Sequence, residues 1–198
     1  ADNGLHLLTS TDLKEAKVLA RELEQINKER KEIQEETVTE AESLFHHHVD
    51  MEKDRVIVLA SEIFHPGVIG IAASRLVDKY QRPTVLIALE EGEGKGSGRS
   101  IPRFNLHKAF TDCSGHLIQF GGHAYAAGLS IKEDQVDAFR NAMNEVGHRY
   151  LTEEDLIPEV RVDAVLSLEE IGRSLYSRMA LLEPFGTENP VPSFLSQG

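Results

Sequence analysis

Two short segments of this sequence combine groups that could bind a phosphate. In the first, residues 96–100 (Gly-Ser-Gly-Arg-Ser), two hydroxyls and one guanidinium lie between flexible glycine positions. Ser97 and Arg99 would point to the same face of an extended strand because they are two residues apart. A hydroxyl beside a bidentate guanidinium suits a terminal phosphate, and Ser100 adds a second hydroxyl to the candidate site. The alternative is an arginine on a flexible hairpin loop.

The second segment is Gly121-Gly122-His123, between an apolar stretch and a strand of small residues. Paired glycines let backbone N–H groups approach a ligand closely, and successive N–H groups can form an anion-binding concavity. His123 could then donate to a phosphate oxygen or stack on a base. Taken alone, the triplet is more typical of a tight turn that carries a surface histidine.

Two further candidates belong to expected helices. His65 precedes Pro66 at the start of a helix predicted over residues 67–80, where anions bind readily, although a surface histidine is also ordinary there. Arg30 occupies an apolar-stripe position of a helix predicted over residues 12–45. Its guanidinium either reaches water while its stem packs, or points into a cleft, and the periodicity does not separate the two.

The helix over residues 12–45 has no proline or glycine, and Thr11 or Asp12 could cap it. Its apolar stripe is narrow, and the helix is longer than the globular average. Packing along an edge or between two domains is therefore expected. The stripe consists of Ala16, Leu19, Leu23, Ile26, Arg30, Ile33, Thr37, Ala41 and Leu44.

The middle of the chain alternates between strands and helices. Residues 55–60 and 84–89 are β-branched runs joined by the helix over 67–80, which predicts a right-handed crossover and parallel pairing. A polar, glycine-rich turn then predicts a hairpin return. The remaining predicted elements are a strand at 96–101, a helix at 105–110, a strand at 126–131 and a helix at 133–150.

We therefore expect an α/β fold with a mixed, mostly parallel sheet flanked by helices and preceded by a long connecting helix. After residue 152 a strand over 160–165 and a helix over about 168–181, capped by Ser167, lead to a proline-rich connector. The expected domains are residues 1–50, 51–150 and 151–198. The chain stops soon after the connector, so we expect it to be part of a longer polypeptide.

Composition narrows the classes of function. The net charge of −12 argues against a general DNA-coating protein, yet residues 95–125 contain four cations and one acid, which suggests a confined anion site. No apolar run approaches the roughly 20 residues of a membrane span, so no membrane contact is expected. The single cysteine, Cys113, and the lack of a signal peptide suit a cytoplasmic protein. No dense Asp/His cluster predicts a metal site or a catalytic residue.

Taken together, several segments resemble the RecJ single-stranded-DNA exonucleases of the DHH phosphoesterase superfamily. The resemblance covers nearly the whole chain, and its spaced motifs are more specific than any one of them. They are residues 23–34 (LEQINKERKEIQ), 65–76 (HPGVIGIAASRL), 96–102 (GSGRSIP), 120–128 (FGGHAYAAG) and 182–190 (LEPFGTENP), the last matching a linker before an oligonucleotide-binding barrel.

This resemblance implies a division of labour. An N-terminal domain with an Asp-His-His motif would hold Mn²⁺ or Mg²⁺ and hydrolyse the strand from its 5′ end, in DNA repair and recombination. The DHH-associated domain would grip single-stranded DNA. This sequence contains no Asp-His-His triplet, so the partner catalytic domain is expected elsewhere in the same polypeptide, and the chain alone is expected to be inactive. By resemblance, Arg30, Ser97 and Arg99 would hold the 5′-phosphate, and His123 with its glycines would line the nucleotide path.

Two other classes of function remain open. One is a DHH-family phosphodiesterase for oligonucleotides or cyclic dinucleotides, which shares a glycine–histidine loop. The LEPFGTENP segment argues against it, because those smaller enzymes would stop before a barrel. The other is a non-enzymatic nucleic-acid-binding module like the related domain of alanyl-tRNA synthetases. The segment 96–102 fits the RecJ family better.

Overall fold

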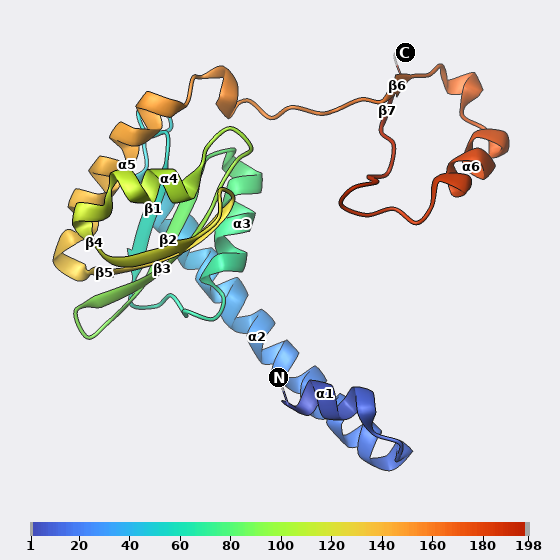
Figure 1. Ribbon diagram of the computed structural model, residues 1–198, viewed down its shortest axis with the longest axis horizontal. Coiled ribbons are helices and arrows are strands. Elements are labelled where there is room, and N and C mark those ends of the chain that lie inside the picture. Colours follow the sequence, from blue (N-terminus) through green and yellow to red (C-terminus); the bar gives the residue numbers. More distant parts are fainter. Residues whose placement is uncertain (1, 197–198) are drawn as a thin grey trace. The chain divides into compact units, whose positions relative to one another are not determined.

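The chain divides into two units, and the first unit ends at Ile157. A five-stranded mixed sheet lies at the centre of this first unit (Figure 1). The structure, a computed structural model, describes residues 2–196. The strand order is β1-β2-β3-β5-β4. The strands are β1 (Ile57–Ser61), β2 (Thr84–Glu90), β3 (Glu93–Arg99), β4 (Leu117–Gly122) and β5 (Ala126–Lys132).

The expectation of a mostly parallel sheet is wrong, although the sheet is mixed. Within this five-stranded sheet only β1 and β2 pair in parallel, through the crossover helix α3 (Ile69–Tyr80), while the other three pairings are antiparallel. The cause is local. Glu91 and Gly92 both adopt positive φ, 51° and 80°, which reverses the chain tightly between β2 and β3. β4 and β5 are likewise adjacent in sequence and pair antiparallel, whereas the chain crosses over from β3 to β4 and leaves room for β5 between them.

Helices cover the two faces of the sheet unequally. On one face, α4 (Leu106–Asp112) and α5 (Val136–Tyr150) pack on a core that extends across the sheet (Figure 1). On the other face, α3 packs on β2 and on part of β3, and the last turns of α2 (Leu13–His48) pack on β1. Much of β3 and the strands β5 and β4 are left uncovered on that second face.

Glycines in β3 fix which way its side chains point. Gly94, Gly96 and Gly98 are buried, and a Cβ on any of them would come within 2.5–2.7 Å of a core side chain on the α4–α5 face. Lys95, Ser97 and Arg99 alternate with these glycines and therefore face the uncovered side.

The long helix α2 is confirmed, and the Asp12 carboxylate caps it by accepting from the Lys14 N–H at 2.7 Å. It is buried only near its end, where the Phe45 ring stacks on Tyr80 at 3.8 Å between centroids. The first part of α2 projects from the sheet, with the unanticipated helix α1 (Asp2–Thr9) packed against it (Figure 1).

The second unit contains little regular structure. The expected strand over 160–165 is reduced to β6 (Ala164–Val165), which pairs in parallel with β7 (Phe194–Leu195). Ser167 does form a capping box with Glu170, but the helix expected to follow is interrupted at Gly172, which N-caps α6 (Arg173–Met179). No residue between 158 and 196 is buried.

Short 3₁₀ turns complete the secondary structure. They are η1 (Ser114–His116), η2 (Glu133–Gln135), η3 (Glu154–Leu156), η4 (Leu168–Glu170) and η5 (Ala180–Leu182). Across residues 2–196, none of the helices combines the length and the apolar character that a membrane span requires.

Candidate nucleic-acid interface

Ser97 and Arg99 lie side by side on β3, at the border between α3 and the uncovered part of the sheet face. The Arg99 Nη1 group donates to the Ser97 hydroxyl at 3.2 Å and to the Gly98 carbonyl at 2.8 Å. The guanidinium rests against the first turn of α3, where a Cβ on Gly70 would lie 2.7 Å from Arg99 Nη2 and 3.0 Å from Ser97 Oγ. Gly70 therefore leaves the space that the guanidinium occupies.

Arg99 lacks an acidic partner in an acidic protein. It is half-buried, and no ion pair within residues 2–196 includes it. Its two hydrogen-bond acceptors there are a hydroxyl and a carbonyl, both neutral. A guanidinium that is partly removed from water without a counterion is electrostatically suited to an anionic ligand.

Two exposed glycines continue the face beside Ser97. Ser97 pairs with Gly128 across β3 and β5, and Gly128 pairs with Gly121 across β5 and β4. Paired residues of antiparallel strands share a face, so the three form one row across the sheet. Gly121 and Gly128 are both exposed, which leaves bare backbone beside the hydroxyl.

A polar row runs parallel to the glycine row. Lys95 pairs with Ser130, and Ser130 pairs with Gln119, whose Nε2 group donates to the Ser130 hydroxyl at 3.4 Å. The two glycines of the first row and all three residues of the polar row line an open hollow of about 490 Å³, which we call the glycine hollow. Its lining residues are Lys95, Gly96, Gln119, Phe120, Gly121, Gly128, Leu129 and Ser130.

The predicted glycine–histidine loop closes the β4–β5 hairpin. Gly122 has a φ of 136°, and a Cβ there would lie 2.5 Å from the Ala126 carbonyl, so this position requires glycine. The His123 N–H donates to the same carbonyl at 2.8 Å, and the His123 side chain is exposed. The Tyr125 carbonyl accepts from the Ser100 N–H at 3.1 Å, which fixes this loop beside the end of β3.

Ser100 is not brought into the cluster. Its hydroxyl donates to the Phe104 carbonyl at 2.7 Å and closes the turn after β3. The alternation that puts Ser97 and Arg99 on one face directs the next side chain to the other.

His65 lies beside a second hollow, of about 790 Å³, whose lining also includes Lys95 and Ser130. Its Nδ1 accepts from the Gly67 N–H at 3.1 Å, which assigns the proton of the neutral ring to Nε2 and leaves that group free to donate. His65 therefore shares a hollow with Lys95, whereas Arg99 is not among the residues that line this hollow.

Arg30 sits one turn before the buried part of α2. Its guanidinium donates to the Asn27 side chain at 3.1 and 3.2 Å and to the Gln34 side chain at 2.8 Å. Like Arg99, it is half-buried and forms no ion pair among the described residues. These contacts keep it on the helix surface, and no hydrogen bond joins it to Ser97 or Arg99.

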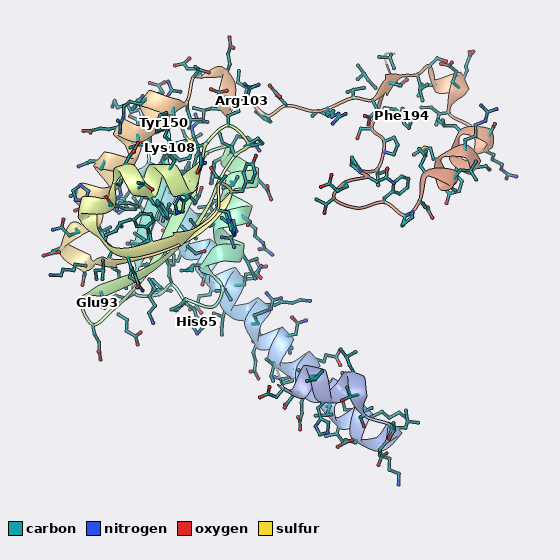
Figure 2. The ribbon with its side chains drawn as sticks, viewed as in Figure 1. His65, Glu93, Arg103, Lys108, Tyr150 and Phe194 are labelled. Atoms are coloured by element: carbon teal, nitrogen blue, oxygen red, sulfur yellow. The ribbon has the colours of Figure 1, made fainter. Side chains whose placement is uncertain are left out.

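The basic segment is divided between two faces. Lys95 and Arg99 face the uncovered side, whereas Lys108 lies on α4 with its ammonium 4.4 Å from the centre of the Tyr150 ring. Arg103 pairs with Asp155 at 3.2 Å. Figure 2 shows Arg103, Lys108 and Tyr150 together on the α4–α5 side, away from His65 and Glu93.

Acidic residues bound the site at one end. Glu62, Glu90, Glu91 and Glu93 line the larger hollow with His65 and Lys95. Within residues 2–196, no group of three or more His, Cys, Asp or Glu side chains has an arrangement that could hold a metal ion. Cys113 is buried in the α4–α5 core, and burial raises the pKa of its thiol to about 11.

None of Gly70, Lys95 and Gly128 is predicted from the sequence as a site residue, although Lys95 is one of the four cations of the basic segment and Gly128 ends the motif over residues 120–128. A signal existed for each of them. Lys95 is two residues before Ser97 and shares its face by the same alternation. Gly70 lies inside a predicted helix, where glycine costs stability and so suggests a close contact. Gly128 is an isolated glycine in a predicted strand, which suggests close approach of another group.

Comparisons with known proteins identify a domain family and relatives of this chain. Residues 53–148 match the DHHA1 domain family. The single-stranded-DNA-specific exonuclease RecJ of Bacillus subtilis is 41% identical over 198 residues, which cover 98% of this chain and 25% of that protein. The RecJ of Escherichia coli is 34% identical, covering 96% of this chain and 34% of that protein.

The fold comparison gives the same result. A crystal structure of RecJ in complex with Mn²⁺ from Thermus thermophilus superimposes with a TM-score of 0.85 at 31% identity, over 98% of this chain and 28% of that one. The chain thus spans about a quarter to a third of the length of these relatives. It belongs to the RecJ family, as a segment that contains the DHHA1 domain.

Proposed function

We propose that this chain is the strand-holding part of a 5′→3′ single-stranded-DNA exonuclease of DNA repair and recombination. Ser97 and Arg99 bind the 5′-phosphate, and Gly121, Gly122 and His123 line the path of the terminal nucleotide. Mn²⁺ or Mg²⁺ bound by another domain of the same polypeptide supplies the hydrolytic chemistry. Two of the similar solved structures are RecJ complexes with these ions, which supports metal use by the whole enzyme.

One observation carries the proposal: the half-buried Arg99 guanidinium has neutral partners only, between the first turn of α3 and the part of the sheet face that no helix covers. A structural arginine in an acidic protein would be expected to pair with a carboxylate. A terminal phosphate would instead accept from the guanidinium and from the Ser97 hydroxyl together. The nearby glycines allow the attached nucleotide to approach the backbone.

The test is equilibrium binding of a short oligodeoxythymidylate with either a 5′-phosphate or a 5′-hydroxyl, at fixed salt concentration. We expect the chain to prefer the phosphorylated strand by about tenfold, the scale of one charge-assisted contact. Arg99→Ala should abolish this preference, and Arg99→Lys should restore only part of it because the bidentate fork is lost.

Arg103→Ala is the matched control. Arg103 belongs to the same basic segment but is exposed and paired with Asp155, away from the uncovered face. This variant should keep the phosphate preference. Equal binding of the two strands by the unaltered chain, or an unchanged preference in Arg99→Ala, would refute the proposed role of Arg99.

A further inference from the structure

The fold itself does not require the paired glycines Gly121 and Gly128. A Cβ on Gly121 would meet nothing within 4 Å, and one on Gly128 would meet only the Gly96 carbonyl, at an ordinary 3.6 Å. Neither glycine has a positive φ, in contrast to Gly122. Glycine weakens a strand interior relative to alanine, so we infer that two adjacent unconstrained glycines keep space free for another group.

That space is the glycine hollow, and its walls are polar on one side. Ser130 and Gln119 offer both donors and acceptors, and Lys95 offers an ammonium that no carboxylate pairs with among residues 2–196. The floor is bare backbone, because the side chains of Phe120 and Leu129 point to the opposite, α4–α5 face of the sheet. A flat group with hydrogen-bonding atoms along its edge would be complementary to this arrangement.

We propose that the glycine hollow receives the sugar and base of the 5′-terminal nucleotide. This inference rests on the proposed function, in which Ser97 and Arg99 hold the phosphate of that nucleotide. The base lies over Gly128 and Gly121 and presents its edge to the row formed by Lys95, Ser130 and Gln119.

The dimensions of the sheet agree with this placement. Neighbouring strands are about 5 Å apart, so Gly128 and Gly121 lie about 5 and 10 Å from Ser97 across the sheet. That span is comparable with the length of a nucleoside attached to its phosphate. The polar row lies two residues along the strands, about 7 Å away, where it can reach the edge of a base lying on the glycines. Unpaired strand ends expose such edges.

The test fills the hollow without altering the phosphate contacts. Gly128→Val places a side chain over the floor and leaves Ser97 and Arg99 in place. Three strands are compared: a 5′-phosphorylated strand, its 5′-hydroxyl form, and a 5′-phosphorylated strand whose terminal residue is an abasic tetrahydrofuran. We expect Gly128→Val to bind the first strand about tenfold more weakly and to lose clearly less affinity for the abasic strand, which keeps only its sugar ring in the hollow. Gly121→Val should behave in the same way.

Folding is checked separately, by circular dichroism and the thermal midpoint. Valine is favoured in strands, so both variants should fold at least as stably as the unaltered chain. Gly115→Val is the matched control, because Gly115 is also exposed with nothing within 4 Å of its added Cβ but lies in η1, outside the hollow. It should bind all three strands normally.

The outcomes for the two proposals are distinguishable. If Gly128→Val folds and binds the first strand normally, the assignment of the hollow is overturned, whatever Arg99→Ala does. If the unaltered chain binds the phosphorylated and hydroxyl strands equally, the role of Arg99 is overturned. The contrast between the strand with a terminal base and the abasic strand then still decides whether the hollow holds a base.

Discussion

The hydrogen-bond and ion-pair partners of the buried and half-buried arginines distinguish those with a structural role from the one with a proposed binding role. Arg55 pairs with Glu153, and Arg140 pairs with Asp137. Burial of the Arg82 guanidinium lowers its pKa. Four backbone carbonyls accept hydrogen bonds from this guanidinium and so stabilise its charge. Arg30 and Arg99 have neutral side-chain or backbone partners instead. Of these two, only Arg99 borders the uncovered part of the sheet face.

Gly70 provides a test of this arrangement that does not touch Arg99 itself. Gly70→Ala should stabilise α3 by up to about 1 kcal/mol, because alanine is the better helix former. Its methyl group would displace the flexible end of the Arg99 side chain, which lies 2.7 Å from the added Cβ. We therefore expect higher stability in urea together with a reduced preference for 5′-phosphorylated strands.

The double variant Gly70→Ala/Arg99→Ala is the control for this prediction. Without the guanidinium, the added methyl should leave the remaining strand affinity unchanged and still stabilise the helix. An undiminished phosphate preference in Gly70→Ala would show that the position of Arg99 against α3 does not matter for binding.

At this scale the sequence predicts the Ser97–Arg99 pair correctly, because strand alternation is a local property. Grouping Ser100 with Ser97 and Arg99 in one candidate site is wrong for the direction of the Ser100 side chain. The same strand alternation directs Ser100 to the opposite face from Ser97 and Arg99. The contact between Gly70 and Arg99 joins residues from different elements, and no local pattern contains it. The functional roles of all these residues remain predictions.

Among the elements, the β2–β3 hairpin limits where a strand can run. Glu90, Glu91 and Glu93 surround its turn, and all three line the larger hollow beside Lys95. Phosphates would be repelled there, so the hairpin marks one boundary of the proposed path. Replacing the three glutamates with glutamine should strengthen binding of short single strands by a few-fold, and most at low salt.

A charge-matched control uses Glu159, Glu169 and Glu188 of the second unit. Replacing these with glutamine changes the net charge by the same amount but leaves the hairpin unaltered. Equal gains in affinity from the two triple variants, measured across a salt series, would mean that the hairpin acts only through the net charge of the protein.

Helices and strands are predicted correctly from the sequence where one of their faces is buried. They are missed where neither face is buried. The α2 and α3 helices and the parallel β1–β2 pair follow from periodicity and from the length of their connection. β4 is missed because its residues are largely exposed, it ends in two glycines, and its register shifts between Leu117 and Gln119. An edge strand of this kind is defined by pairing with β5, which is not visible in its own pattern.

At the scale of the whole molecule, the two units differ in what stabilises them. The first unit contains both hydrophobic core clusters. Residues 158–196 contain no buried side chain, and their single strand pairing involves two residues on each side. Burial of apolar surface is the main source of folding free energy, so the first unit should account for nearly all of the measured stability.

Truncation tests this division of stability. Ending the chain after Ile157 should shift the thermal midpoint by less than about 2 °C, because little buried apolar surface is removed. Ending it after Thr152 should lower the midpoint clearly. That cut removes the buried Leu156, whose carbonyl accepts from Arg82 at 3.4 Å, and Asp155, which accepts from the Thr152 N–H at 2.9 Å. A large loss of stability already in the longer truncation, measured by calorimetry, would show that residues after 157 contribute to the core.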